Sequence, residues 1–209
     1  MFTFFSFNFS GQNESKKWYF GSQAGLDFTT SPPTVLTNGA IFASAGCASI
    51  ADAMGNLLFY TNGFSIWDRT HSLMANGTGL TGLPSGPQNS IIIKKPQSST
   101  IYYIFTTGTI NGLCYTTVDM SLSSGNGSVT ALNTPLLSSY FSTKVSAVKH
   151  CNGSDIWLVA RDAFYISGAN VPYSPINFHA FPITASGINT TAVVSPANAY
   201  NWTGNSNGW

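Results

Sequence analysis

Leu58-Phe59-Tyr60-Thr61-Asn62-Gly63 and Tyr103-Ile104-Phe105-Thr106-Thr107-Gly108 are two versions of one pattern, an apolar stretch that ends in polar residues and a glycine. They lie 45 residues apart, and a weaker third version, Ile156 to Arg161, follows after a further 54 residues. Short apolar runs that end at Gly and Asn are typical of β-strands followed by tight turns. A strand that recurs at such a spacing predicts an internal structural repeat.

Each version of the pattern has a predicted strand before it and another after it. The turns between them contain Gly, Asn or Pro, which supply backbone angles that other residues resist. The preceding strands are Cys47 to Asp52, Ser90 to Lys94 and Val145 to Lys149, and the following strands are Phe64 to Trp67, Leu113 to Asp119 and Phe178 to Ile183. Each unit is therefore expected to be an antiparallel meander, and the Gly- and Pro-rich segments 76–88 and 123–135 are expected to connect the units.

Units of about 45 to 55 residues with about four short strands are the signature of propeller blades. We expect an all-β fold, a β-propeller with WD40-like four-stranded antiparallel blades, over residues 12–209. Three blades are placed at residues 36–75, 88–123 and 140–195, and the start of a fourth follows. The structural rival is a β-sandwich of seven or more strands, which does not require one strand to recur at a fixed offset.

Three blades and part of a fourth do not close a ring of four to eight. We therefore expect an incomplete ring, with further blades in the same polypeptide. The alternative is that copies of the chain pair edge to edge to complete the ring.

The composition excludes several classes of partner. Of the 209 residues 43% are hydrophobic and only 7% are charged, with a net charge of +1. Because no basic run could follow a phosphate backbone, we expect no nucleic-acid partner. No stretch approaches the roughly 18 apolar residues that cross a bilayer, so we expect no transmembrane segment. Residues 1–11 are rich in phenylalanine and are interpreted as the remnant of a secretory signal peptide, with an alternating edge strand as the other interpretation.

Several stretches resemble the propeller-like N-terminal region of large Bacteroidetes surface proteins, which end in a gliding-motility-associated, type IX secretion (type B) sorting domain. These stretches include Trp18-Tyr19-Phe20-Gly21, Ala24 to Phe28, Gly55 to Gly63 and Gly187 to Thr191. The resemblance covers about residues 17–208. It implies a secreted, extracellular or cell-surface protein with a role in adhesion or in the display of other domains. It brings no set of catalytic residues.

Glycoside hydrolysis is the enzymatic alternative, and it requires two carboxylates about 5 to 9 Å apart. The aspartates Asp52, Asp68, Asp119 and Asp155 fall singly at or near turns. We expect each to bind the backbone of its own turn. The alternative is therefore a sugar-active propeller enzyme whose catalytic residues lie partly outside this chain, and we expect no catalytic site in the chain itself.

Histidine and cysteine show no metal-binding pattern. His71, His150 and His179 are far apart in the sequence, without the spacing of a zinc site. His150, at the end of a strand, is expected to be hydrogen-bonded in the following turn. The three cysteines Cys47, Cys114 and Cys151 are interpreted as buried thiols, with one disulfide plus one free thiol as the alternative. We expect no metal and no cofactor.

Aromatic side chains suggest glycan or protein binding. Trp18, Trp67, Trp157 and Trp202 are possible stacking platforms, although most strand aromatics should pack between sheets. The weak candidate for direct ligand binding is Tyr173, which lies in a loop between two prolines, Pro172 and Pro175. The sequence thus predicts a non-catalytic binding module whose partner is a glycan or a cell-surface protein.

Overall fold

The computed structural model describes residues 13–83, 85–108, 112–138, 141–162 and 177–196. These residues form β-strands and two short 3-10 helices, η1 (Asn13–Ser15) and η2 (Ser123–Gly125), without an α-helix. The strands are β1 (Lys17–Phe20), β2 (Ala24–Asp27), β3 (Thr34–Leu36), β4 (Ala48–Ala51), β5 (Leu57–Thr61), β6 (Ser65–Asp68), β7 (Leu73–Thr78), β8 (Ser90–Lys94), β9 (Ile101–Gly108), β10 (Gly112–Asp119), β11 (Ser128–Leu137), β12 (Phe141–Lys149), β13 (Ile156–Asp162), β14 (Asn177–Thr184), β15 (Gly187–Ile188) and β16 (Val193–Pro196). The prediction of an all-β fold is confirmed.

The strands pair as three sheets. The first contains β1, β2 and β3 in that order, and the last contains β12, β13 and β14 with β15 and β16 both paired to β14. Between them lies an eight-stranded sheet of order β4-β5-β6-β7-β11-β10-β9-β8. Its two edge strands, β4 and β8, contact each other, so this sheet nearly closes on itself.

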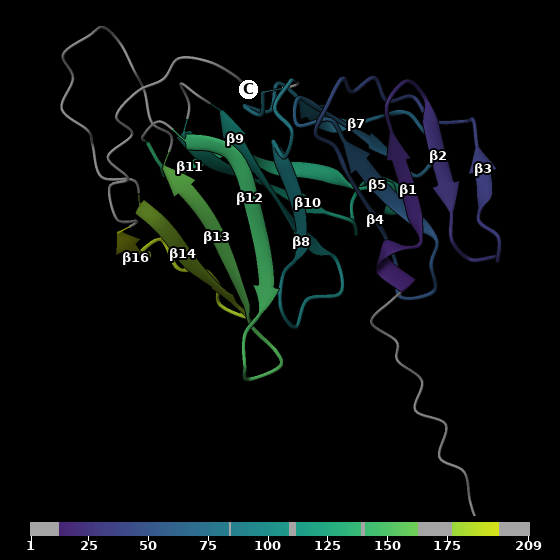
Figure 1. Ribbon diagram of the computed structural model, residues 1–209. Coiled ribbons are helices and arrows are strands. Elements are labelled where there is room, and N and C mark those ends of the chain that lie inside the picture. The colour runs from purple at the N-terminus through teal and green to yellow at the C-terminus, as the bar shows by residue number, and fades with distance from the viewer. Residues whose placement is uncertain (1–12, 84, 109–111, 139–140, 163–176, 197–209) are drawn as a thin grey trace, which may run out of the picture.

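The eight-stranded sheet consists of two antiparallel meanders, β4 to β7 and β8 to β11. They join through their last strands, β7 and β11, which run parallel and pair at Ala75 and Ser128. In Figure 1 the first sheet lies at the right and β13, β14 and β16 lie at the left, with strands of the two meanders between them.

Two of the three repeated apolar strands, β5 and β9, are buried on both faces. In β9, Tyr102 and Ile104 face one hydrophobic core, which they share with β5 and β6, whereas Tyr103 and Phe105 face a second core, which they share with β13 and β14. Successive side chains of a strand point to opposite faces, so a strand between two cores needs an unbroken apolar run. This burial explains why the repeat is visible as a continuous apolar pattern rather than as an alternating one.

The fourth strand of each meander, β7 or β11, lies partly in a segment that was predicted to be a connection. β7 ends at Thr78 and β11 occupies Ser128–Leu137, so the prediction that residues 76–88 and 123–135 only connect units was wrong. β11 pairs with β10 through three register shifts, contains Pro135, and holds Asn133 at φ +51°. Such irregularities remove the period of two by which strands are recognised in a sequence. No strand had been predicted for residues 17–36, where the first sheet lies.

The cysteines only partly meet the expectation of buried thiols. All three are free, with Cys114 buried, Cys47 partly exposed and Cys151 exposed. The prediction of burial was wrong for Cys151 because the residue lies in the turn between β12 and β13, where the chain folds back into solvent. In the described part of the chain, no helix is long and apolar enough to cross a lipid bilayer.

Candidate ligand-binding cavity

A cavity of about 570 Å³ lies where β1, β4 and β8 come together. Each of these strands belongs to a different meander, so the cavity is formed at the junction of three successive units of the chain. The lining residues are Trp18, Tyr19, Phe20, Leu26, Cys47, Ala48, Ser49, Ile91 and Ile92. Most of these side chains are aromatic or aliphatic, and the size lies within the range of small-ligand sites.

Trp18 is the most exposed large side chain of the lining. Half of its surface (50%) is accessible, although its ring contacts Phe28 at a centroid distance of 5.1 Å. The indole Nε1–H donates a hydrogen bond of 2.7 Å to the carbonyl oxygen of Ser15 in η1. Trp18 is thus held in orientation while part of it stays available for contact, which is the property expected of a stacking platform.

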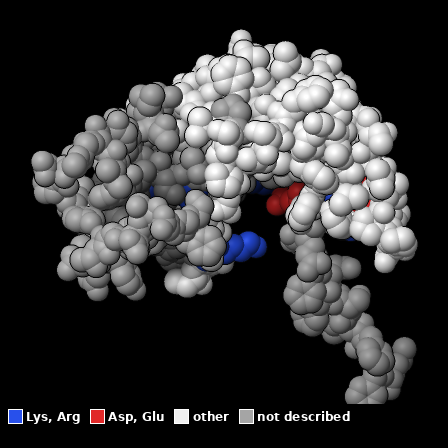
Figure 2. Space-filling view, turned by 45° about the horizontal axis from the view of Figure 1, so that its top comes forward, with Lys and Arg blue, Asp and Glu red and all other residues white. Residues whose placement is uncertain are grey.

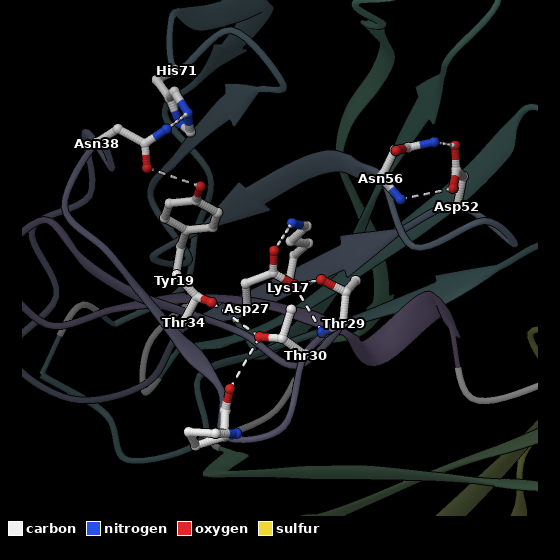
Figure 3. Close-up of polar contacts among 11 residues, drawn as sticks. Lys17, Tyr19, Asp27, Thr29, Thr30, Thr34, Asn38, Asp52, Asn56 and His71 are labelled. Carbon is white, nitrogen blue, oxygen red and sulfur yellow. Dashed lines mark hydrogen bonds and ion pairs between the residues drawn. The ribbon is translucent and has the colours of Figure 1, made fainter.

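Tyr19 points to the opposite side of β1 and anchors the strand. Its ring stacks on Tyr60 of β5 with centroids 4.7 Å apart, and only 4% of the residue is exposed. The Tyr19 hydroxyl donates to Oδ1 of Asn38 at 3.1 Å, and Asn38 in turn contacts His71, as Figure 3 shows. Burial raises the pKa of Tyr19, so its hydroxyl stays protonated and able to donate.

His71 joins the loops on the far side of this network. Nδ2 of Asn38 lies 2.8 Å from Nε2 of His71 and can only donate, so Nε2 accepts and Nδ1 carries the proton. Nδ1 lies 3.1 Å from the hydroxyl of Tyr60, which therefore accepts from it. Burial lowers the pKa of His71 below its ordinary value, even though nearby Asp68 favours the charged form. The neutral imidazole is a structural link rather than a metal ligand.

Ser49 connects β4 to the edge of β1. Its hydroxyl donates to the carbonyl oxygen of Lys17 at 2.9 Å and accepts the backbone N–H of Tyr19 at 3.4 Å. Cys47 lies beside it in the cavity lining, and burial raises the pKa of its thiol. A thiol kept protonated is a weak nucleophile, so Cys47 is not activated for catalysis.

Asp27 is the carboxylate on the strand next to β1. It forms an ion pair with Lys17, and its Oδ1 accepts hydrogen bonds from the backbone N–H and the hydroxyl of Thr29 at 2.9 and 2.7 Å (Figure 3). Burial raises its pKa, but the hydrogen bonds from Lys17 and Thr29 outweigh burial and lower the pKa to about 2. Asp27 is therefore ionised and fully engaged, which leaves it unsuited to act as a general acid.

Asp52, Asp68 and Asp119 bind the backbone of their own turns, as predicted, whereas the carboxylate of Asp155 accepts a side-chain amide instead. Oδ1 of Asp52 accepts the backbone N–H groups of Met54 and Asn56, and Oδ1 of Asp68 accepts those of Thr70 and Ser72. Oδ1 of Asp119 accepts the backbone N–H and the hydroxyl of Ser121, while Asp155 receives the side-chain amide of Asn152 at 2.7 Å. These contacts account for the carboxylates as elements of their own turns.

The other residues singled out in the sequence are dispersed. Trp67 stacks on Tyr60 at 5.6 Å and Trp157 on His150 at 5.5 Å, so both serve packing. Nδ1 of His150 accepts the backbone N–H of Asn152 at 3.1 Å, which confirms its predicted role in the turn. Tyr173, Trp202 and the segment 1–11 lie outside the described residues.

The described residues contain no group of three or more His, Cys, Asp or Glu side chains that could hold a metal ion. His179, the third histidine of the sequence, is buried and stacks on Phe181 at 6.4 Å. Charges are few on the face in Figure 2, and most of the coloured atoms visible there border the hollow beneath the arched surface. The cavity lining itself has no charged side chain among its members.

Comparisons with protein-family models, with curated proteins and with solved structures found no match to this chain.

Of the cavity lining, the sequence identified only Trp18 as a candidate. Ile91 and Ile92 were assigned to a strand, but a strand assignment does not show which unit of the fold its residues face. Ser49 was missed because a serine among many carries no signal of its own. Ser49 could have been identified from its position, because it lies in a strand that precedes one of the repeated apolar strands.

Proposed function

We propose that this chain is a non-catalytic binding module of a secreted or cell-surface protein, and that its ligand, a glycan or a segment of a protein, occupies the cavity between β1, β4 and β8. The observation that carries the proposal is the lining of this cavity. It combines a half-exposed tryptophan with aliphatic side chains and a few hydroxyl and backbone groups. Such a surface suits non-covalent recognition of a ligand with an apolar face.

The architecture that we propose is an incomplete β-propeller whose meanders act as blades. Two features support it. β4 to β7 and β8 to β11 are successive four-stranded antiparallel meanders. Their first strands lie next to each other, and β12, the first strand of the next sheet, contacts β8 and β9. A series of meanders whose first strands line a common axis is the arrangement of blades around a channel.

The exposed apolar side chains at both ends of this series support further blades. In the first sheet Val35 of β3, which does not line the cavity, is 69% exposed. In the last sheet Phe178, Val193 and Val194 are 43 to 61% exposed. Apolar faces of this kind are normally covered. We propose that additional blades of the same protein cover them.

A binding experiment with a blocked cavity tests the function. The full chain and its Ala48→Trp variant are applied to a glycan array and to an array of cell-surface proteins. We expect a ligand that binds the wild-type chain and is lost when the new indole fills the cavity. Val148→Trp, at an exposed position of β12, is the matched control and should bind as the wild type does.

Two outcomes would contradict the proposal. One is a ligand that binds all three proteins equally, which would place recognition elsewhere on the surface. The other is hydrolysis of aryl glycosides by the wild-type chain that is lost on Asp68→Asn or Asp119→Asn, which would favour the sugar-active enzyme. Export is tested separately, by sequencing the N-terminus of secreted material. A mature protein that begins near Gly11 or Gln12 supports it, and one that begins at Met1 contradicts it.

A further inference from the structure

Among the described residues, the first sheet has no counterpart of the strand that begins each of the two meanders after it. Three equivalent turns establish the correspondence. Asp27 ends β2, Asp68 ends β6 and Asp119 ends β10. In each case Oδ1 accepts the backbone N–H and the hydroxyl of the residue two positions on, which is Thr29, Thr70 or Ser121.

β6 and β10 are the third strands of their meanders. By this correspondence β2 is also a third strand, and β1 and β3 are the second and the fourth. No described residue supplies a first strand, since β1 stands at the edge of its sheet.

The later meanders show what normally covers this edge. β4 pairs antiparallel with β5, with Ile50 opposite Phe59, and β8 pairs antiparallel with β9, with Ile92 opposite Ile104. The covering strands read Ala-Ser-Ile-Ala and Ser-Ile-Ile-Ile-Lys, so they are short and made mainly of small and apolar residues.

At β1, the edge that faces away from β2 is hydrogen-bonded by one side chain, that of Ser49. The Ser49 hydroxyl bonds to the carbonyl oxygen of Lys17 and to the N–H of Tyr19, which are the groups on either side of Trp18 that face away from β2. A neighbouring strand would bond to these same groups with its backbone. The Ser49 hydroxyl thus makes the two hydrogen bonds that one residue of a neighbouring strand would make with its backbone.

The cavity runs beside this edge, because three consecutive residues of β1, Trp18 to Phe20, line it. The rest of the lining is Leu26 of β2, Cys47 just before β4, and residues of β4 and β8, which are the first strands of their own meanders. An apolar space next to a strand edge that is bonded by a side chain rather than by another strand resembles the sites used in β-augmentation, where backbone hydrogen bonds supply affinity and pockets for alternate side chains supply specificity.

We propose that the ligand of this cavity is an extended strand of a partner polypeptide, which pairs antiparallel with β1 and places small and apolar side chains in the cavity. The inference rests on the proposed function, because it names the class of ligand for the same site. Binding displaces the Ser49 hydroxyl from Lys17 and Tyr19. The partner strand resembles β4 and β8, since those strands cover the equivalent edges in the same fold.

A synthetic peptide with the sequence of residues 88–95, Gln-Asn-Ser-Ile-Ile-Ile-Lys-Lys, with blocked ends, is the probe. Calorimetric titration into the full 209-residue chain should give saturable binding at one site. Ala48→Trp should weaken binding at least tenfold, while Val148→Trp should leave it unchanged. Circular dichroism and the melting temperature verify that both variants are folded. Ser49→Ala should strengthen binding several-fold, because the edge of β1 is then open.

Methylation of backbone amide nitrogens in the peptide distinguishes backbone hydrogen bonding to β1 from general hydrophobic contact. Only alternate residues of a paired strand bond to a given neighbour. Methylating the amide nitrogens of one alternate set should therefore abolish binding, and methylating the other set should leave it nearly intact. Equal effects of the two sets, or binding that Ala48→Trp does not change, would overturn the proposal.

The other possible occupants give different results. If the peptide does not bind and Cys47 of the free chain is as unreactive toward maleimide as buried Cys114, another part of this chain fills the cavity and the inference is wrong. A dimer in sedimentation that Ala48→Trp dissociates would assign the cavity to a second copy, and would also overturn it. If the peptide fails but an array ligand is still lost on Ala48→Trp, the proposed function stands and only the strand is refuted.

Discussion

The Asn89 side chain lies directly against the backbone of Gly63, where an added Cβ atom would stand 2.8 Å from the Asn89 Nδ2 atom. Asn89 is fully buried, and this Nδ2 donates to the carbonyl oxygens of Asn62 at 3.0 Å and Leu83 at 2.7 Å. The amide therefore ties the turn between β5 and β6 to the loop before β8. This link thus joins the two meanders whose first strands, β4 and β8, both line the cavity.

Asn89→Ala should destabilise the chain by about 2 to 3 kcal/mol, because two partly buried carbonyl groups lose their donor and a void remains. Urea unfolding followed by circular dichroism measures the change. Asn126→Ala, in the partly exposed turn after η2, is the control and should change the free energy of unfolding by less than about 0.5 kcal/mol. Equal effects of the two substitutions would contradict the role of Asn89.

Gly63→Ala should also destabilise the chain, by about 1 kcal/mol or more. Gly63 has φ +84°, where a side chain is strained, and the new Cβ would collide with Asn89. In the double variant with Asn89→Ala the collision is absent, so the combined loss should be smaller than the sum of the two single losses. Additive losses in the same unfolding experiment would show that the two residues do not interact.

The stability of the chain should fall as the pH drops below about 6.5, in part because of His71. Burial lowers the pKa of His71 in the folded chain, whereas the unfolded chain has the ordinary value of about 6.5. Between these two values the unfolded state binds more protons, so protonation favours unfolding. His71→Asn tolerates the positive φ of 66° and removes the titration. Unfolding free energies measured from pH 8 to pH 5 should therefore slope less in the variant.

The Lys17–Asp27 ion pair should make a contribution to stability that is lost only in strong acid. The pKa of Asp27 is about 2 in the folded chain, below its ordinary value of 3.8 in the unfolded chain. The contribution is therefore complete when the pH is above 3.8, and it disappears as the pH falls through about 2. Lys17→Met should raise the pKa of Asp27 toward its ordinary value. Carbon-13 titration of labelled aspartate measures the shift. Lys16→Met should leave this pKa unchanged, and an equal shift there would refute the specific pairing.

The three thiols should react with maleimide in the order Cys151, Cys47, Cys114. Cys151 is exposed, Cys47 is partly buried with a raised pKa, and Cys114 is buried in β10. The thiolate is the reacting form, so both burial and a raised pKa slow the reaction. Mass spectrometry of peptides at successive times gives the three rates. Rapid labelling of Cys114 in the folded chain would contradict the packing of β10.

The unbroken apolar runs allowed β5 and β9 to be recognised from the sequence, because each is buried on both faces and has no polar side to break the run. The turn aspartates were recognisable for a similar local reason, since each bonds within four residues of itself. β7 and β11 could not be recognised from the sequence, because their bulges and polar residues hide the alternation of side chains that marks a strand. Recognition was therefore best where the physical cause lies within a few neighbouring residues.

By itself, the sequence of this protein determined that the fold is all-β, that its apolar strands recur, and that its aspartates belong to turns. Only the tertiary structure decided that β1, β4 and β8 enclose one cavity, that Ser49 bonds to the edge of β1, and that Asn89 packs on Gly63. These last contacts join residues 26 to 32 positions apart. Propensity and turn chemistry act over a few residues, whereas the packing of one meander on the next depends on the whole chain.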